Sequence, residues 1–314
     1  MVTMTEGNSQ NSSGNTDSLT RKAPAKINWF LEILRKRDDG YHEIFTLMQK
    51  IDFCDELTFS ARKDSRITLD CDKPDLPRDE NNLVVAAAQA LKEATSCNLG
   101  ADIFLRKSIP IGAGFGGGSS DAATTLVTLN DLWSLDASPN ELHNIAAELG
   151  SDINFFLEEA SIAKCEGRGE KVTPLENAPG VDLVVVWPGQ PISSSEIYRS
   201  GLIDLTSERV KCNLSYTSES DGVILSSAAK GIFNRLSAPC ERTFGFISSA
   251  LQKTQEIAGE RVVSLSGSGS GFYIVCEDQE AAKRLEGELL GIFEPPSVVK
   301  ATKTFADHRR TSTE

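Results

Sequence analysis

A glycine-rich segment in the middle of the chain constrains the fold more than any other feature. It reads PIGAGFGGGSS from Pro110 to Ser120 and holds five glycines. The preceding ADIFLRKSIP alternates as a β-strand does, and the following DAATTLVTLNDLW has apolar residues at helical spacing. Glycine permits positive φ and close approach, so consecutive backbone N–H groups can converge on phosphate oxygens near a helix N-terminus. This order of strand, glycine loop and helix predicts a phosphate site.

The residues assigned to this site are Pro110, Ile111, Gly112, Ala113, Gly114, Phe115, Gly116, Gly117, Gly118, Ser119 and Ser120. Two other interpretations of the segment stay open. GAGFGG satisfies the dinucleotide pattern G-x-G-x-x-G, although the flanking elements do not repeat as βαβ units. A flexible or tightly turning glycine loop, in which Ser119 or Ser120 only caps the helix, is the simplest alternative. No lysine follows the glycines, so the segment is not a P-loop of the G-x-x-x-x-G-K-[ST] kind, and the protein-kinase motifs HRD and DFG are absent.

Composition limits the classes of partner. The 314 residues carry a formal net charge of −13, which argues against nucleic acid because its phosphates are bound by Lys and Arg. The 39% of hydrophobic and 25% of charged residues are typical of a soluble globular protein. The seven cysteines lack metal-binding spacing, and no apolar stretch approaches the length of a membrane span. We therefore expect a cytoplasmic protein, neither secreted nor membrane-embedded.

Mixed strand and helix patterns predict an α+β protein of two domains. Residues 1–20 are rich in Ser, Asn, Thr and Gly and are expected to form a disordered tail. The N-terminal domain is expected at residues 21–170 and the C-terminal domain at 171–314. An early strand from Ala25 to Ile33 should place Lys26, Asn28, Phe30 and Glu32 on one face and Ile27, Trp29, Leu31 and Ile33 on the other. The charged turn RKRDDGYH after it predicts a hairpin that presents Tyr41 and His42.

Six segments, in order, resemble motifs of the GHMP kinases. APAKINWFLEI, PIGAGFGGGSSDAA and LSGSGSGFYIV resemble the three motifs of that family. GYHEIFTLMQ, LGSDINFF and CEGRGEKVTPL resemble the branch that phosphorylates the 2-hydroxyl of 4-diphosphocytidyl-2-C-methyl-D-erythritol in the non-mevalonate isoprenoid pathway. Phe115 departs from the usual leucine and leaves the glycines intact. The resemblance implies a ribosomal-S5-like ATP-binding domain followed by a C-terminal α/β sandwich domain.

The resemblance also implies catalytic and substrate-binding roles. Asp152 matches the family's catalytic aspartate, and Lys26 matches the lysine that polarises the acceptor hydroxyl. Taken alone, Asp152 could merely cap a short helix and Lys26 could be a solvated strand residue. The implied substrate contacts are Tyr41 and His42 at the cytosine, and Ser194 and Tyr198 from a loosely matching segment. Asn28 shares a strand face with Lys26 and is expected to touch the sugar or the polyol.

ATP and Mg²⁺ are the implied cofactors. Ser120 is a candidate metal ligand, because its hydroxyl ends the phosphate loop. The implied partner is a small-molecule substrate, and the chain is expected to be a monomer or weak homodimer. Mevalonate, a sugar or homoserine stays open as an alternative acceptor, although none of these has a base for Tyr41 to stack on.

A second glycine cluster, SLSGSGSGFYIV, lies between two apolar extended runs. On its own it predicts a turn of minimal side-chain bulk. In the family the corresponding loop packs beside the phosphate site, so Gly267, Gly269 and Gly271 are expected to permit close approach there.

Overall fold

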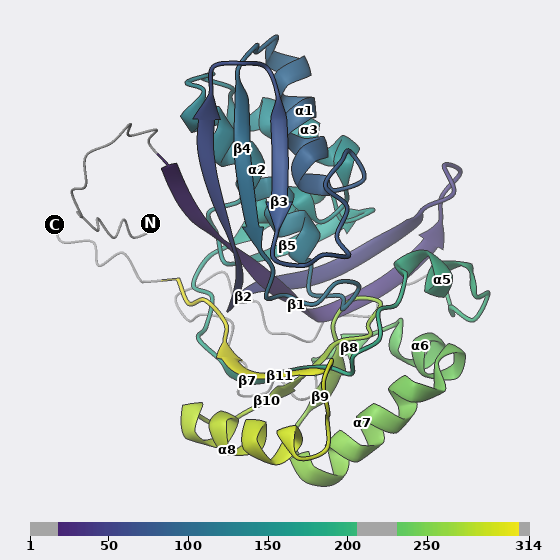
Figure 1. Ribbon diagram of the computed structural model, residues 1–314. Coiled ribbons are helices and arrows are strands. Elements are labelled where there is room, and N and C mark those ends of the chain that lie inside the picture. The colour runs from purple at the N-terminus through teal and green to yellow at the C-terminus, as the bar shows by residue number, and fades with distance from the viewer. Residues whose placement is uncertain (1–17, 206–230, 308–314) are drawn as a thin grey trace, which may run out of the picture.

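Two β-sheets, each covered by helices, form the described part of this computed structural model, residues 18–205 and 231–307 (Figure 1). The larger sheet has the strand order β3-β4-β2-β1-β8, with β5 paired to β2 and β6 paired to β5. Its strands are β1 (Ser18–Lys36), β2 (His42–Arg62), β3 (Ile67–Cys71), β4 (Gly100–Arg106), β5 (Ile162–Gly167), β6 (Lys171–Leu175) and β8 (Phe233–Asn234). Most of its pairs are antiparallel, as expected for an α+β protein.

The long β1–β2 hairpin is the backbone of this sheet, and it carries the predicted turn that ends at Tyr41. Lys26 and Asn28 share a face as predicted, since the lysine Nζ lies 2.6 Å from the asparagine Oδ1. The predicted alternation is wrong beyond Asn28. A register shift between Asn28 and Phe30 inserts Trp29 as an extra residue. Phe30 therefore packs with Ile27 and Trp29, and Leu31 turns to the face of Lys26 and Asn28.

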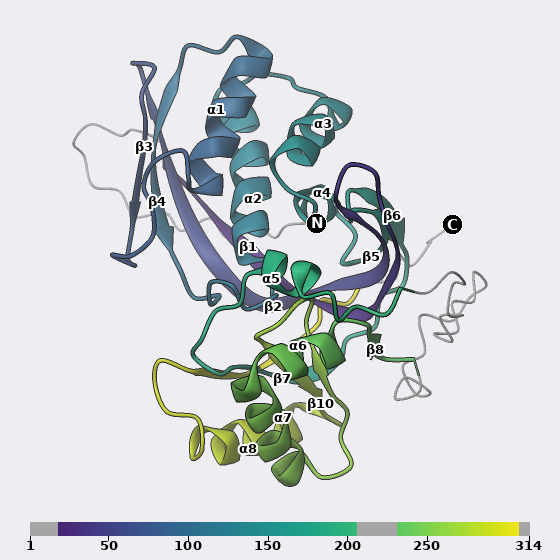
Figure 2. The ribbon, with the colours of Figure 1, turned by 90° about the vertical axis from the view of Figure 1, so that its right-hand side faces the viewer.

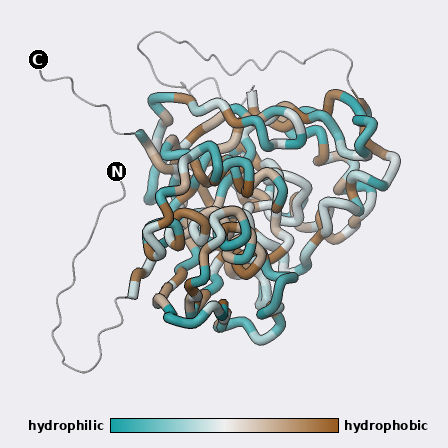
Figure 3. Tube along the Cα trace, turned by 90° about the horizontal axis from the view of Figure 1, so that it is seen from above, coloured by the Kyte–Doolittle hydropathy of each residue, from teal (hydrophilic) through white to brown (hydrophobic). Residues whose placement is uncertain are grey.

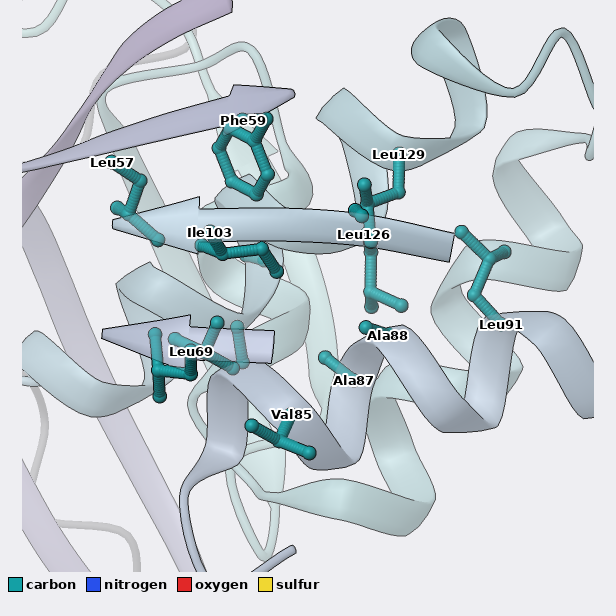
Figure 4. Close-up of a cluster of buried hydrophobic side chains, with 14 of the residues drawn as sticks. Leu57, Phe59, Leu69, Val85, Ala87, Ala88, Leu91, Ile103, Leu126 and Leu129 are labelled. Carbon is teal, nitrogen blue, oxygen red and sulfur yellow. The ribbon is translucent and has the colours of Figure 1, made fainter. Parts of the chain in front are cut away.

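Four helices cover one face of the larger sheet. They are α1 (Leu83–Thr95), α2 (Gly117–Leu132), α3 (Pro139–Leu149) and α4 (Ile153–Leu157). Helix α1 begins where the Asn82 side chain accepts the Val84 N–H, and Ser138 with Glu141 forms a capping box for α3. Figure 4 shows the apolar side chains of α1 and α2 meeting those of β2, β3 and β4, including Leu91, Ile103 and Leu126. This core fixes the N-terminus of α2 relative to the sheet.

The smaller sheet has the strand order β11-β7-β10-β9, and helices cover the face that points away from the larger sheet (Figure 1). Its strands are β7 (Asp182–Trp187), β9 (Val263–Leu265), β10 (Phe272–Val275) and β11 (Val298–Lys303). The helices of this half are α5 (Ser194–Arg199), α6 (Ser237–Thr243), α7 (Gly245–Ala258) and α8 (Gln279–Leu290). Figure 3 shows hydrophilic residues on the outer turns and hydrophobic stretches inside the fold.

A third apolar cluster joins the two sheets. Trp29 of β1 packs edge-on against Tyr273 of β10 with ring centroids 5.4 Å apart, and the Tyr273 hydroxyl donates to the Asn28 carbonyl. Phe115 of the glycine loop belongs to the same cluster and is 1% exposed. The two halves therefore share a core, and the glycine loop is part of their junction.

Two expected boundaries need correction. The boundary between residues 170 and 171 falls inside the β5–β6 hairpin, so we propose a division after Leu175, between β6 and β7. The expected tail of residues 1–20 is wrong at its end, because β1 begins at Ser18 and pairs there with Ser60 of β2. The rest of that tail lies outside the described residues. Chain order does not separate the halves fully, since β8 pairs with β1.

Candidate active site

A continuous cavity of about 1320 Å³ opens at the junction of the two halves. Its walls come from the glycine loop, the β1–β2 hairpin, helix α5 and the segment at Gly267 and Ser268. Figure 2 shows α5 beside this seam. Pockets for one small ligand usually measure roughly 300–1,000 Å³, so this cavity has room for two ligands at once.

The glycine loop enters the cavity with the backbone geometry of an anion site. Gly112, Gly114 and Gly116 have φ of 65°, 74° and 72°, a region that favours glycine. Gly116 is the N-cap of α2, which begins at Gly117. The helix thus starts earlier than the sequence pattern predicted, because the last glycines form its first turn. The N–H groups of the first three residues of the helix have no acceptor within it, so they can bind an anion.

Ser119 and Ser120 have different surroundings. Ser119 lines the cavity together with every residue from Pro110 to Gly118, and Ser120 does not. Ser120 is completely buried, and its Oγ has no hydrogen-bond partner within the described ranges. The expectation that the Ser120 hydroxyl contacts phosphate or metal is therefore not supported, although its backbone remains in the loop.

The second glycine cluster backs the phosphate loop. The Gly271 N–H donates to the Ala113 carbonyl at 3.0 Å, and the Ser266 hydroxyl donates to the Gly114 carbonyl at 2.9 Å. A Cβ at Gly271 would lie 2.6 Å from the Phe115 ring, and one at Gly114 would lie 2.0 Å from the Ser266 carbonyl oxygen. The close approach expected at Gly271 is confirmed. These contacts hold the phosphate loop against the second glycine cluster.

A buried charged cluster that sequence reasoning missed lies under the loop. The Lys107 ammonium donates to both Asp55 and Asp121, and the distance to Asp121 Oδ2 is 2.7 Å. Asp55 also accepts the N–H groups of Ser108 and Ile109, which anchors the start of the loop. Burial alone would lower the pKa of Lys107, but the two carboxylates outweigh it and raise that pKa. Burial raises the pKa of Asp121. The position of Lys107, three residues before the start of the loop at Pro110, was the available sequence signal.

Lys26, Asn28 and Asp152 meet between the loop and the hairpin, as the resemblance implied. The Lys26 ammonium is 3.6 Å from Asp152 Oδ2, and the side chain of Asn28 donates to Thr46. Lys26 and Asn28 are each 3% exposed, whereas the Asp152 side chain is 32% exposed. Asp152 occupies the N-cap position of α4 but makes no side-chain capping bond, so capping does not explain it. This leaves a cavity-facing carboxylate beside a buried ammonium.

An aromatic corner closes the other end of the cavity. His42 stacks on Tyr198 of α5 with ring centroids 5.1 Å apart, and Tyr41 is 53% exposed beside them. Burial, with a smaller contribution from Lys36, lowers the pKa of His42. Ser194 at the start of α5 hydrogen-bonds the Ser268 hydroxyl at 2.8 Å. Tyr41, His42, Ser194 and Tyr198 all line the cavity, so the structure brings these predicted residues together.

Beyond the loop the cavity continues into a region that the sequence pattern did not single out. Its walls there include Leu76, Pro77, Asn82, Leu83 and Leu105. This apolar wall with a buried amide beside it suits a planar ring next to the phosphate loop. The segment before α1 gave no periodic signal, so reasoning from periodicity could not identify this wall.

The described residues hold no group of three or more His, Cys, Asp or Glu side chains arranged to bind a metal ion. Across the same ranges, no helix has both the length and the apolarity that a bilayer crossing requires. The cysteines within those ranges are unpaired.

The chain is similar to known kinases over most of its length. Residues 82–157 match the family described as GHMP kinases N terminal domain. The 4-diphosphocytidyl-2-C-methyl-D-erythritol kinase of Thermodesulfovibrio yellowstonii is 40% identical over 283 residues, which cover 86% of this chain and 95% of that protein. The kinase of the same name from Prosthecochloris aestuarii is 37% identical over 280 residues, 87% of this chain and 94% of that protein.

Solved structures agree with this relationship. A crystal structure of 4-(cytidine 5'-diphospho)-2C-methyl-D-erythritol kinase has a TM-score of 0.74 and 30% identity, and the match covers 92% of this chain and 100% of that one. Homoserine kinase from Cytophaga hutchinsonii, at 15% identity, matches with a TM-score of 0.61 over 95% of this chain and 98% of that one, and shows the shared fold. The chain belongs to the 4-diphosphocytidyl-2-C-methyl-D-erythritol kinases of the GHMP kinase family.

Proposed function

We propose that the protein transfers the γ-phosphate of ATP to the 2-hydroxyl of 4-diphosphocytidyl-2-C-methyl-D-erythritol, in the non-mevalonate isoprenoid pathway. One observation carries the proposal. The pair of Lys26 and Asp152 lines the same cavity as the glycine loop, which suits a phosphate, and the aromatic corner, which suits a base. A kinase for this acceptor needs these three parts in contact, because donor phosphate and acceptor hydroxyl must meet.

The donor half holds ATP. The triphosphate binds the N–H groups of the loop and of the first turn of α2, where the helix dipole favours negative charge. The adenine ring lies against the wall formed by Leu76, Pro77 and Leu83, close to the Asn82 amide. The dinucleotide alternative loses its support, because the larger sheet is mostly antiparallel and the glycine loop lies outside its β3–α1–β4 unit, whereas a dehydrogenase carries this loop inside a βαβ unit.

Asp152 acts as the general base in the transfer. The acceptor oxygen attacks the γ-phosphorus while the bond to the bridging oxygen of the β-phosphate breaks, and ADP leaves. Asp152 takes the proton of the attacking hydroxyl. The ammonium of Lys26 stabilises the carboxylate and the negative charge of the transferred group, and its hydrogen bond to Asn28 fixes its direction.

Mg²⁺ would be held mainly by the nucleotide. Mg²⁺ commonly uses one or two carboxylates with substrate phosphates and keeps several waters, so a large protein cluster is unnecessary. Each of the three cavity-lining aspartates has a cationic partner, since Asp121 binds Lys107, Asp39 binds Arg37 and Asp152 lies 3.6 Å from the Lys26 ammonium, so the phosphates would supply most of the ligands. When bound, the ion would offset phosphate charge during the transfer.

The acceptor half recognises the cytidyl group. Tyr41 and Tyr198 offer aromatic faces to the base, and His42 offers ring nitrogens to its edge. Asn28 and Ser194 lie along the cavity wall where the polyol and its diphosphate extend towards Asp152.

ADP release measured with a panel of acceptors tests the proposal. The cytidyl acceptor should support turnover, and mevalonate, homoserine and galactose should not. Turnover with one of those three and none with the cytidyl compound would replace the proposed acceptor. The cytoplasmic location and the state of monomer or weak homodimer stay predictions.

A further inference from the structure

The Tyr41 ring, which would carry the base, has little around it to fix its orientation. Its backbone is held, because Asp39 accepts the Tyr41 N–H and the Tyr41 carbonyl accepts the Arg37 N–H at 2.8 Å. The ring itself is 53% exposed. An aromatic ring on an exposed turn can occupy several rotamers, and a base that must first select one of them binds more weakly.

Arg168 lies over this ring. Its guanidinium carbon is 4.8 Å from the Tyr41 ring centroid, within the range of a cation–π interaction. The guanidinium also donates to the Ala147 carbonyl at 3.0 Å, and Arg168 itself lines the cavity. One ring face is thus covered by a fixed cation, and the opposite face is left for a stacking partner.

Hydrogen bonds hold the turn that carries Arg168. It joins β5 to β6, and Glu170 accepts the Arg168 N–H at 2.6 Å. Gly167 has a φ of 75°, and a Cβ there would lie 2.6 Å from the Glu170 carboxylate. That φ favours glycine, and the Glu170 carboxylate, which packs against Gly167, fixes the backbone of Arg168 through its N–H.

The same turn reaches the catalytic end of the cavity. The Asn154 side chain of α4 donates to the Glu170 carbonyl at 3.0 Å, and the Cβ position of Gly169 lies 3.5 Å from Asp152 Oδ1. Figure 2 shows β5 and β6 beside α4. The β5–β6 turn therefore contacts both the base-stacking ring of Tyr41 and the surroundings of the general base, Asp152.

We propose that Arg168 is a positioning residue, which holds the Tyr41 ring in the orientation that stacks on the acceptor's base. This inference rests on the proposed function, because it assigns the base to Tyr41. The guanidinium acts through the ring, because its other contacts are within the protein. The Ala147 carbonyl accepts one N–H of the guanidinium, and Glu170 Oε2 lies 4.0 Å from the Arg168 Nε and balances the positive charge.

Calorimetric binding of cytidine and of cytidine diphosphate tests this role without turnover. Arg168→Ala should weaken both ligands to the same degree, about threefold to tenfold, the size of a partly desolvated cation–π contact. Arg168→Gln, which retains a donor for Ala147, should weaken them similarly, and Arg168→Lys should recover part of the loss. ATP affinity should not change. Arg284→Ala, at an arginine whose side chain is 66% exposed on α8, is the matched control and should bind as the wild type does.

A double-mutant cycle with Tyr41→Leu gives the decisive comparison. Since Arg168 acts through the ring, Arg168→Ala should have no further effect in the Tyr41→Leu background. A loss that persists there, or one seen with cytidine diphosphate and not with cytidine, would show a direct contact to phosphate and overturn the positioning role. A wild type that binds neither cytidine compound while binding ATP would overturn the proposed function itself.

Discussion

The two halves of the cavity differ in which chemical groups bind the ligand: mainly backbone groups in the donor half and side chains in the acceptor half. The phosphate site of the donor half consists of backbone groups in a continuous segment, and the apolar side chains of that segment, Ala113 and Phe115, are each 1% exposed. The acceptor half consists of side chains from the β1–β2 turn, α5 and the β5–β6 turn. A backbone site should tolerate changed side chains but no added carbon at glycines that have a positive φ and closely packed neighbours. A site built from side chains should instead lose affinity when those side chains are changed.

The largest effect is expected at Asp152, where the halves meet. Asp152→Asn removes the proton acceptor but keeps the shape, so kcat should fall by about 10²–10⁴-fold. ATP affinity should remain within a factor of a few, because the loop is untouched. Steady-state ADP release and nucleotide titration measure the two quantities. Asp131→Asn, at an exposed aspartate near the end of α2, is the control. Wild-type turnover in Asp152→Asn would remove Asp152 from the mechanism.

A pair of glycine variants tests the backbone character of the donor half. Gly114→Ala would place a carbon 2.0 Å from the Ser266 carbonyl oxygen at a φ of 74°, so it should lower the free energy of unfolding by about 2–4 kcal/mol. At Gly118 the nearest contact of an added carbon is 3.5 Å, to Leu83. Gly118→Ala should therefore leave the free energy of unfolding nearly unchanged. Denaturant unfolding of both variants is the measurement, and equal stabilities would contradict the packing of the two glycine loops.

Tyr198 tests the side-chain character of the acceptor half. Tyr198→Ala should raise KM for the cytidyl acceptor by about tenfold, since stacking of one base contributes roughly 1–3 kcal/mol. KM for ATP should stay constant. Tyr198→Phe keeps the ring and serves as the matched control, with a KM near that of the wild type. If the two variants raised KM equally, the hydroxyl and not the stack would be the contact.

The same contrast explains what the sequence could predict. The donor site was readable because strand, glycines and helix follow one another in a few residues. The start of α2 was missed, since glycines at 117 and 118 have no helical signal of their own. The side of Phe30 was missed because a bulge at Trp29 depends on the partner strand.

The acceptor site was assembled from the family resemblance, since its residues are far apart in the chain. Tyr41 and Tyr198 line the same cavity although 157 positions separate them (198 − 41). The periodicity of a sequence carries no information about contacts between such distant residues. Arg168 and Lys107 were missed for the same reason: each derives its role from contacts across the fold, the first with Tyr41 and the second with Asp55 and Asp121.

The smallest effect is expected from the protonation of His42. Burial lowers its pKa, and Lys36 adds to this, so His42 is neutral at pH 7 and charges only below the ordinary value of about 6.5. Protonation removes the ring's acceptor nitrogen, so KM for the cytidyl acceptor should be constant from pH 7 to 8 and rise severalfold at pH values below the ordinary pKa of histidine. Because the unfolded chain binds this proton more readily, folding stability should also fall as the pH drops through that range. The KM profile of His42→Gln should be flat. Lys36→Gln, which removes the smaller cause, should move the rise in KM to slightly higher pH, and an unchanged profile there would leave burial as the whole cause.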